Sequence, residues 1–207
     1  MDYIKTIIGL FVIVDPLGVV PIFISMTAGH SRSDKRAIAK TATLTASGVL
    51  AGAALTGQHL LDFFGVSIPA FRVAGGVLLL LIAISMLNAQ RPRTKHTPEE
   101  AAEAAEKDSI AVVPLAIPLL AGPGAISSTI LYASQARSWF DYVFLVLACA
   151  LVGASTYLAC ILSEPIGRIL GKTGINIVTR LFGILLAAIG VEFITRGLVQ
   201  LIPSLGH

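Results

Sequence analysis

Long apolar stretches alternate with short polar connections along this chain. Each stretch holds close to the roughly 20 residues that an α-helix needs to cross the hydrocarbon core of a bilayer. Six stretches fit this pattern: Ile4–Met26, Asp34–Leu55, Ile68–Leu87, Ile110–Tyr132, Tyr142–Leu162 and Ile175–Leu201. The pattern therefore predicts an all-α, polytopic membrane protein with six transmembrane helices.

The composition agrees with a membrane setting. Hydrophobic residues make up 55% of the 207 residues, and charged residues make up only 13%. A soluble domain of this length could not bury so much apolar surface. We expect the lipid bilayer as a partner, and we expect no nucleic acid.

Positive charges are distributed unequally between the two sides that six crossings create. One side has four, Lys5, Arg72, Arg137 and Arg196; the other has eleven, Arg32, Lys35, Arg36, Lys40, Arg91, Arg93, Lys95, Lys107, Arg168, Lys172 and Arg180. Cytoplasmic connections carry the excess of Lys and Arg. The charges therefore predict that both termini lie outside the cytoplasm.

The fourth stretch is interrupted by its own sequence. Pro114, Pro118 and Pro123 lie inside it, and Gly122-Pro123-Gly124 lies near its middle. Proline removes a backbone donor and glycine lets the chain unwind. Irregular backbone at membrane depth is tolerated only where it is buried in protein or lines a cavity. This break is the first candidate for a binding site.

The first stretch has a corresponding break at Asp15-Pro16-Leu17-Gly18. A second likeness joins the third and sixth stretches, where FRVAGGVLLL and TRLFGILLAA align Arg72 with Arg180 and Gly75 with Gly183. Each half has three spans, so the second must be inverted relative to the first, as in many secondary transporters. We predict repeats at 1–89 and 110–207, joined by a cytoplasmic linker at 90–109 with a short helix from Thr97.

The second break offers backbone donors to an anion. If a helix begins at Pro123, the amides of Gly124, Ala125 and Ile126 have no partner within it, and Gly122 has no side chain to cap them. A free helix N-terminus favours a carboxylate. Ser127 and Ser128 add hydroxyl groups within a turn. The alternative is a proline kink packed tightly against a neighbouring helix.

The first break differs because it carries an acid. Asp15 lies near mid-membrane, where an ionisable residue is costly and usually functional. It could hold a substrate ammonium or carry a coupling H⁺ or Na⁺. Alternatively, Asp15 caps its own half-helix with Pro16 at the first helical position. The two roles are compatible. The predicted substrate-binding residues are Asp15, Pro16, Gly18, Gly122, Pro123, Gly124, Ala125, Ile126, Ser127 and Ser128.

Other polar or small residues fit structural roles better. Glu192 precedes Arg196 by four residues, which predicts a local ion pair. A stripe of small residues on the second stretch, Thr41, Thr45, Gly48 and Gly52, predicts close helix packing. Cys149 and Cys160 are about three helical turns apart and form no metal or redox spacing. We expect no metal site, no resident cofactor and no catalytic residues, and thus no enzyme.

Three segments resemble signature stretches of the MarC family: FVIVDPLGVVPIF, FRVAGG and VVPLAIPLLAGPGAISSTI. That family includes the small neutral amino acid transporters called SnatA and is similar to the wider LysE superfamily of exporters. The resemblance covers essentially the whole chain. It implies six spans, a prokaryotic plasma (inner) membrane location and, for the transporter branch, substrates such as glycine and alanine.

The residues and the resemblance together predict a secondary transporter of small solutes. Its expected substrates are small neutral amino acids, bound between the broken helices and moved by alternating access. One alternative is a non-transporting membrane scaffold or stress protein, and another is an exporter of a different small solute or ion. The coupling ion, H⁺ or Na⁺, and assembly into a homo-oligomer stay open.

Overall fold

The computed structural model describes residues 2–88, 116 and 119–202, and this part of the chain is helical with short connections. The predicted linker at 90–109, its short helix, and Pro114 and Pro118 lie outside the described residues. Seven helices have these bounds: α1 Tyr3–Val14, α2 Val20–Met26, α3 Arg32–Phe63, α4 Ile68–Leu87, α7 Pro123–Ala133, α8 Trp139–Ile161 and α9 Ser163–Leu201.

Four segments in the described part are long and apolar enough to cross a membrane. They are α3, α4, α8 and the part of α9 from Thr173 to Leu201. The first predicted stretch is instead split into α1 and α2 on either side of its break, and α7 is the second part of the fourth stretch. The all-α prediction is confirmed, whereas six complete spans stay a prediction.

One predicted helix boundary is wrong. The second stretch does not end at Leu55, because α3 runs on to Phe63 and stops at Gly65, whose φ is +67°. The amide of Val66 donates to the carbonyl of Leu61 over 2.9 Å, which is the closing bond of a Schellman motif. The sixth stretch, by contrast, matches the apolar part of α9 from Thr173 to Leu201. The helix α9 as a whole starts earlier, at Ser163, and kinks at Gly171.

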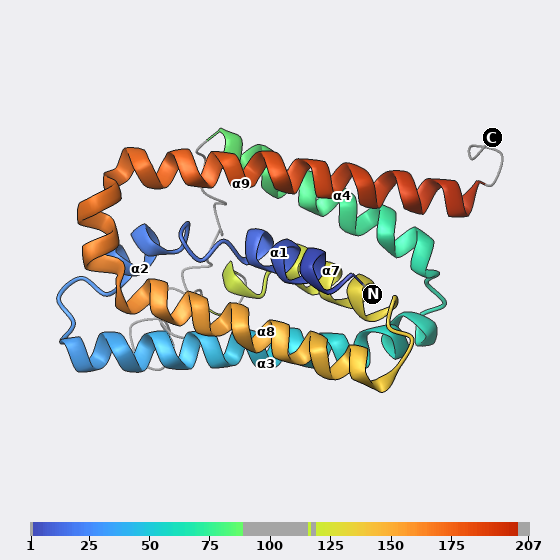
Figure 1. Ribbon diagram of the computed structural model, residues 1–207, viewed down its shortest axis with the longest axis horizontal. Helices are drawn as coiled ribbons and strands as arrows, with labels where there is room; N and C mark the ends of the chain where they lie inside the picture. The colour runs from blue at the N-terminus through green and yellow to red at the C-terminus, as the bar shows by residue number, and fades with distance from the viewer. Residues whose placement is uncertain (1, 89–115, 117–118, 203–207) are drawn as a thin grey trace.

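The helices pack in pairs that join the two halves of the chain. Contacts link α4 with α9, α3 with α8, and α1 with α7, and Figure 1 shows α1 and α7 between the other two pairs. Each pair contains one helix from residues 1–89 and one from residues 110–207. Two repeats related by a twofold axis would pack in this way, but the repeat itself stays a prediction.

Glycines allow α4 and α9 to approach closely. A Cβ added to Gly76 would lie 2.6 Å from the carbonyl oxygen of Gly190, and one added to Gly190 would lie 2.9 Å from that of Gly76. Further along α9, a Cβ added to Gly197 would lie 2.8 Å from the carbonyl oxygen of Pro69 of α4. Small residues permit such backbone contact between membrane helices. This pair is therefore a continuous, closely packed unit.

The prediction that the stripe of small residues on the second stretch packs closely against another helix of the chain is wrong. Thr41 and Gly48 are exposed, and a Cβ added to Gly48 or Gly52 would meet nothing within 4 Å. The opposite side of α3 packs instead, where Gly57 lies against Ile130 and Ser47 lies against Gly153 of α8. Small residues mark both sides of α3, so residue size alone could not identify the packed side.

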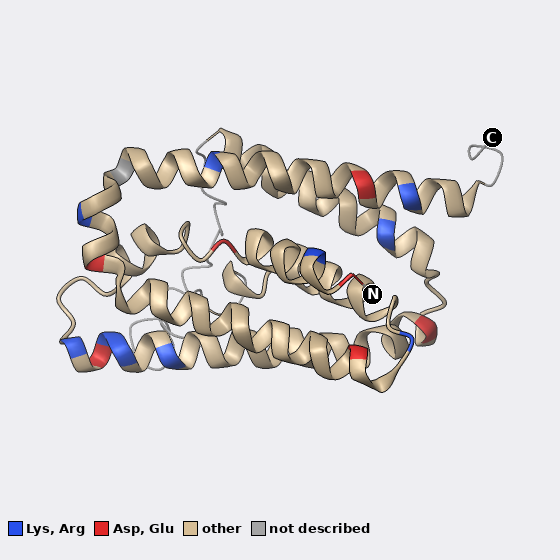
Figure 2. Ribbon diagram, in the orientation of Figure 1, with Lys and Arg blue, Asp and Glu red and all other residues tan. Residues whose placement is uncertain are grey.

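Apolar side chains also cover the outside of the bundle, as lipid-facing helices require. Exposed examples on the four long helices are Leu44, Leu81, Leu151 and Ile184. Charged residues gather toward the two ends of the bundle (Figure 2). We call the end with Arg32, Lys35, Arg36 and Arg168 the basic end. The opposite end, where α1 begins and α9 ends, is the terminal end.

Candidate functional site

The first break is a tight turn that Asp15 stabilises through its own side chain. Asp15 ends α1 in the left-handed region, with φ 46° and ψ 69°. Asp is among the few non-glycine residues that tolerate this conformation. Its Oδ1 accepts a hydrogen bond from the backbone amide of Gly18 over 3.0 Å. The side chain thus stabilises the turn that carries it.

The predicted helix start at Pro16 is wrong. Residues 16–19 form a turn, and α2 begins at Val20 with no side-chain cap. The carboxylate of Asp15 therefore caps the turn rather than α2. Gly18 fits this arrangement because an added Cβ would lie 2.0 Å from Oδ2 of Asp15. A side chain at position 18 would force the carboxylate to move.

Asp15 and Gly18 face a small cavity of about 140 Å³, which we call the Asp15 cavity. Its polar lining comes from three elements: the break itself, Ser85 of α4, and Asn176 and Thr179 of α9. Liquid water occupies about 30 Å³ per molecule. The cavity therefore suits a solute of a few heavy atoms, and it offers that solute one carboxylate, two hydroxyls and one amide.

The second break confirms the start of a helix at Pro123 and the bare cap at Gly122. One predicted donor is wrong, because the amide of Ile126 donates to the carbonyl of Gly122 over 3.0 Å. A helix leaves only its first few amides unpaired, and proline has none. The candidate donors at this break are therefore the amides of Gly124 and Ala125, both in buried residues.

Much of α7 is packed as the alternative interpretation expected. A Cβ added to Gly124 would lie 2.6 Å from Cδ1 of Ile82, and Ser127 lies against Gly75 of α4. Ser128 is different. Its side chain is fully buried, yet its hydroxyl has no hydrogen-bond partner among the described residues. An unpaired buried hydroxyl is costly and is usually explained by a ligand, a water or strain.

The two breaks are neighbours but do not share one cavity. Leu119, just before the second break, lines the Asp15 cavity, and Leu120 lies beside Val14 at a small gap. However, none of the described residues 122–128 lines the Asp15 cavity. The prediction of one chamber between both sets of binding groups is thus not met in this conformation.

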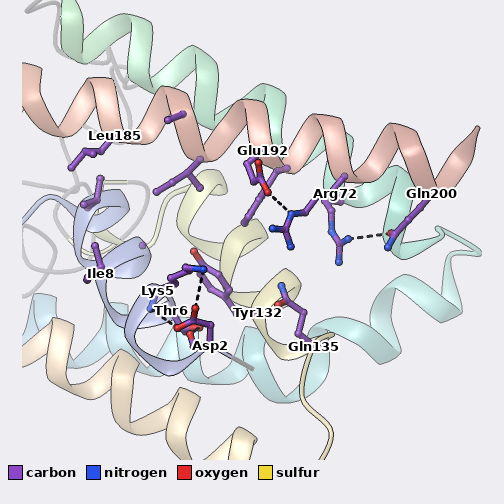
Figure 3. A pocket seen from close by; sticks show the side chains of 16 residues that line it. Asp2, Lys5, Thr6, Ile8, Arg72, Tyr132, Gln135, Leu185, Glu192 and Gln200 are labelled. Atoms are coloured by element: carbon purple, nitrogen blue, oxygen red, sulfur yellow. Dashed lines mark hydrogen bonds and ion pairs between the residues drawn. The ribbon is translucent and has the colours of Figure 1, made fainter. Parts of the chain in front are cut away.

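A second, larger cavity of about 690 Å³ opens at the terminal end, between α1, α4, α7 and α9. We call it the vestibule (Figure 3). Its polar lining consists of Asp2, Lys5, Thr6, Arg72, Tyr132, Gln135, Glu192, Arg196 and Gln200. The predicted ion pair between Glu192 and Arg196 is confirmed. The spacing of these residues along the chain did not indicate that four helices bring them together around one cavity.

Two aromatic contacts lie close to the cavities. On α9, Thr179 lines the Asp15 cavity and Leu185 lines the vestibule, with Phe182 between them. The ring of Phe182 lies 6.1 Å from that of Phe11 of α1. Tyr132 of α7 forms a second ring contact, 6.1 Å from Phe193. Tyr132 and Phe193 line the vestibule itself.

Comparison with known proteins shows which family carries this arrangement. Residues 1–202 match the model of the MarC family integral membrane proteins. The chain belongs to the MarC family. It is 41% identical to the UPF0056 membrane protein YhcE of Escherichia coli (strain K12), over 98% of this chain and 94% of that protein. No solved structure matches the chain.

Relatives in the MarC family come from distant prokaryotes. A UPF0056 membrane protein of Buchnera aphidicola is 41% identical over 99% of this chain and 95% of its own length. Another, from the archaeon Methanocaldococcus jannaschii, is 39% identical over 98% of this chain and 89% of its own length. This MarC protein is thus an integral membrane protein with several apolar helices and with bacterial and archaeal relatives.

Proposed function

We propose that this MarC protein is a secondary transporter of small neutral amino acids such as glycine and alanine. The observation that carries the proposal is the Asp15 cavity. An acid at a broken membrane helix faces a space of about 140 Å³ that is lined by hydroxyl and amide groups. A buried charge is costly in a membrane unless it binds something. The ammonium of a small zwitterion is a suitable ligand.

The second break supplies the donors that would bind the substrate carboxylate once this break and the Asp15 cavity join. The amides of Gly124 and Ala125 lie at the positive end of α7, and Ser128 adds an unpaired hydroxyl one turn later. Because Leu119 lines the Asp15 cavity and Leu120 lines a small gap beside Val14, a small movement of α7 relative to α1 would open these groups to the Asp15 cavity. The substrate would then bind between the breaks.

Alternating access follows from the two cavities in this proposal. The vestibule opens at the terminal end, while the Asp15 cavity is bounded by α2 and by Asn176 and Thr179 near the basic end. Along α9, Phe182 lies between the residues that line one cavity and those that line the other. Rocking of one half of the bundle against the other would expose the breaks to each end in turn. Asp15 is also the candidate carrier of a coupling H⁺ or Na⁺.

Transport itself tests the proposal. Purified protein in proteoliposomes should catalyse counterflow of radiolabelled glycine and alanine, and imposed H⁺ and Na⁺ gradients should identify the coupling ion. Leucine serves as the size control, because a cavity of about 140 Å³ with apolar walls leaves little room for it. A scaffold or stress protein would give no exchange above empty liposomes. An exporter of another solute would give no exchange of amino acids.

A further inference from the structure

The vestibule contains charged side chains that the proposed binding site between the breaks does not use. Five charged residues line it, Asp2, Lys5, Arg72, Glu192 and Arg196, of which three are positive and two are negative. The cavity therefore carries one surplus positive charge. In a cleft, such a surplus attracts an anionic group, and salt screens this attraction because most of these side chains are exposed.

Four of the five charges pair locally. Nζ of Lys5 lies 3.0 Å from Oδ2 of Asp2 at the start of α1. Nε of Arg196 is paired with Oε1 of Glu192, one turn earlier on α9. Of the five charges that line the vestibule, that of Arg72 is the one without an ionic partner among the described residues.

Arg72 is held in place by a neutral group. Its Nη1 donates to Oε1 of Gln200 over 3.1 Å, which connects α4 to the end of α9 (Figure 3). The side chain is half-buried, and Arg196 is close enough to repel it. A planar guanidinium can donate two parallel hydrogen bonds to one carboxylate. An oxyanion at Arg72 would relieve the repulsion and use donors that Gln200 does not occupy.

Glu192 completes the recognition of a zwitterion. It projects from α9 into the same cavity, and only its Oε1 takes part in the pair with Arg196. Its Oε2 can accept a hydrogen bond from an ammonium group. Arg72 and Glu192 thus offer opposite charges on adjoining helices, which suits a small amino acid better than a simple anion or a simple amine.

We propose that the vestibule is a second binding site for small amino acids, in which Arg72 binds the carboxylate and Glu192 binds the ammonium. The site holds the solute at the terminal end, before it enters or after it leaves the Asp15 cavity. Its volume of about 690 Å³ is large for glycine, so charge rather than shape selects the ligand. This inference rests on the proposed function.

Binding in an Asp15→Asn background isolates the vestibule from the site between the breaks. Saturation-transfer NMR on the purified protein would use glycine, acetate and glycinamide as probes. Arg72→Gln should weaken glycine and acetate about tenfold, as expected when a charge-assisted hydrogen bond is lost, and leave glycinamide unchanged. Glu192→Gln should weaken glycine and glycinamide and leave acetate unchanged. Arg72→Lys keeps the charge without the fork and should give an intermediate loss.

Arg137→Gln is the matched control, because Arg137 also lies at the terminal end but lines a different hollow, beside Trp139. It should leave all three probes unchanged. The proposal is overturned if Arg72→Gln weakens glycinamide as much as glycine, or if it weakens none of the probes. Arg72-dependent binding without glycine exchange by the parent would contradict transport and support the vestibule. Glycine exchange by the parent without Arg72-dependent binding would support transport and contradict the vestibule site.

Discussion

The first break satisfies its own backbone, whereas the second leaves polar groups without partners. At the first, the carboxylate of Asp15 accepts from Gly18 and still faces a cavity. At the second, Gly122 gives α7 no side-chain cap, and the buried hydroxyl of Ser128 is unpaired in the described structure. Both breaks combine proline with glycine. One presents a negative charge and the other presents donors, which is the pairing that a zwitterion requires.

A large effect on the first break is expected from position 18. The Cβ of Gly18→Ala would lie 2.0 Å from the present position of Oδ2 of Asp15, so the carboxylate must move out of the turn. The lost hydrogen bond costs about 1 kcal/mol of unfolding free energy. Glycine exchange in proteoliposomes should fall by about tenfold or more, since ~1.4 kcal/mol of binding corresponds to that ratio.

Gly52→Ala is the control for this change, because its Cβ would meet nothing within 4 Å. It should retain exchange. Equal activity of the two alanine variants would contradict a role for the Asp15 carboxylate in its present position.

The next effect distinguishes the second break from the first. Gly122→Asp would place a carboxylate where the substrate carboxylate is expected, beside the amides of Gly124 and Ala125. Aspartate is a good N-cap, so α7 should gain roughly a few tenths of a kcal/mol while glycine binding is lost. Gly122→Ser should cap the helix without the charge and keep partial function. Isothermal titration with glycine and thermal unfolding measure both effects, and unchanged binding by Gly122→Asp would place the substrate carboxylate elsewhere.

A smaller effect concerns the unpaired hydroxyl. Ser128→Ala removes a buried group that has no partner in the described structure, so the free energy of unfolding should rise by about 1 kcal/mol. If a bound substrate uses the hydroxyl, glycine affinity should fall by a few-fold at the same time. A rise in stability with unchanged affinity would restrict the second break to its backbone amides. Denaturation and glycine titration of the same samples give the two numbers.

The smallest expected effect concerns an ion pair outside both breaks, which serves as a reference for the changes at the breaks. At the basic end, Nζ of Lys35 lies 3.0 Å from Oε1 of Glu164, and this hydrogen bond holds the pKa of Glu164 below its ordinary value of 4.5. A depressed pKa adds stability above the unfolded pKa, and that stability is lost as the pH falls through the folded pKa. Glu164→Gln should therefore show a slightly smaller decrease in melting temperature on acidification. Identical acid curves would show that the pair contributes nothing.

Local patterns predicted helix existence better than helix ends. Apolar length identified α4 and α8 to within a few residues, because the bilayer imposes that length. The polar residues after Leu55 suggested an early end, yet α3 continues until Gly65 reverses the chain. For α9, apolar length identified the part from Thr173 to Leu201, whereas the helical segment at 163–170, before the kink, was not predicted.

The candidate site was predicted in part for a similar reason. Proline and glycine fix local backbone, so both breaks and the cap at Gly122 could be located from sequence. The carboxylate of Asp15 was expected to cap a helix from Pro16, but it caps the turn instead. Which side chains meet across helices is a long-range property. Ser85, Asn176 and Thr179 therefore could not be assigned to Asp15, and the vestibule was not foreseen. The aligned glycines illustrate the limit, since Gly75 faces α7 while Gly183 faces α4.

The most direct test compares the parent with Asp15→Asn. Asparagine keeps an oxygen that accepts from Gly18, tolerates the left-handed φ and has nearly the same volume, so only the charge changes. Both proteins should unfold at the same temperature. If the carboxylate binds the substrate ammonium or the coupling ion, counterflow of radiolabelled glycine should be lost in the variant under every H⁺ and Na⁺ gradient. Counterflow at the parent rate, with unchanged ion dependence, would contradict the account and leave Asp15 with its structural role alone.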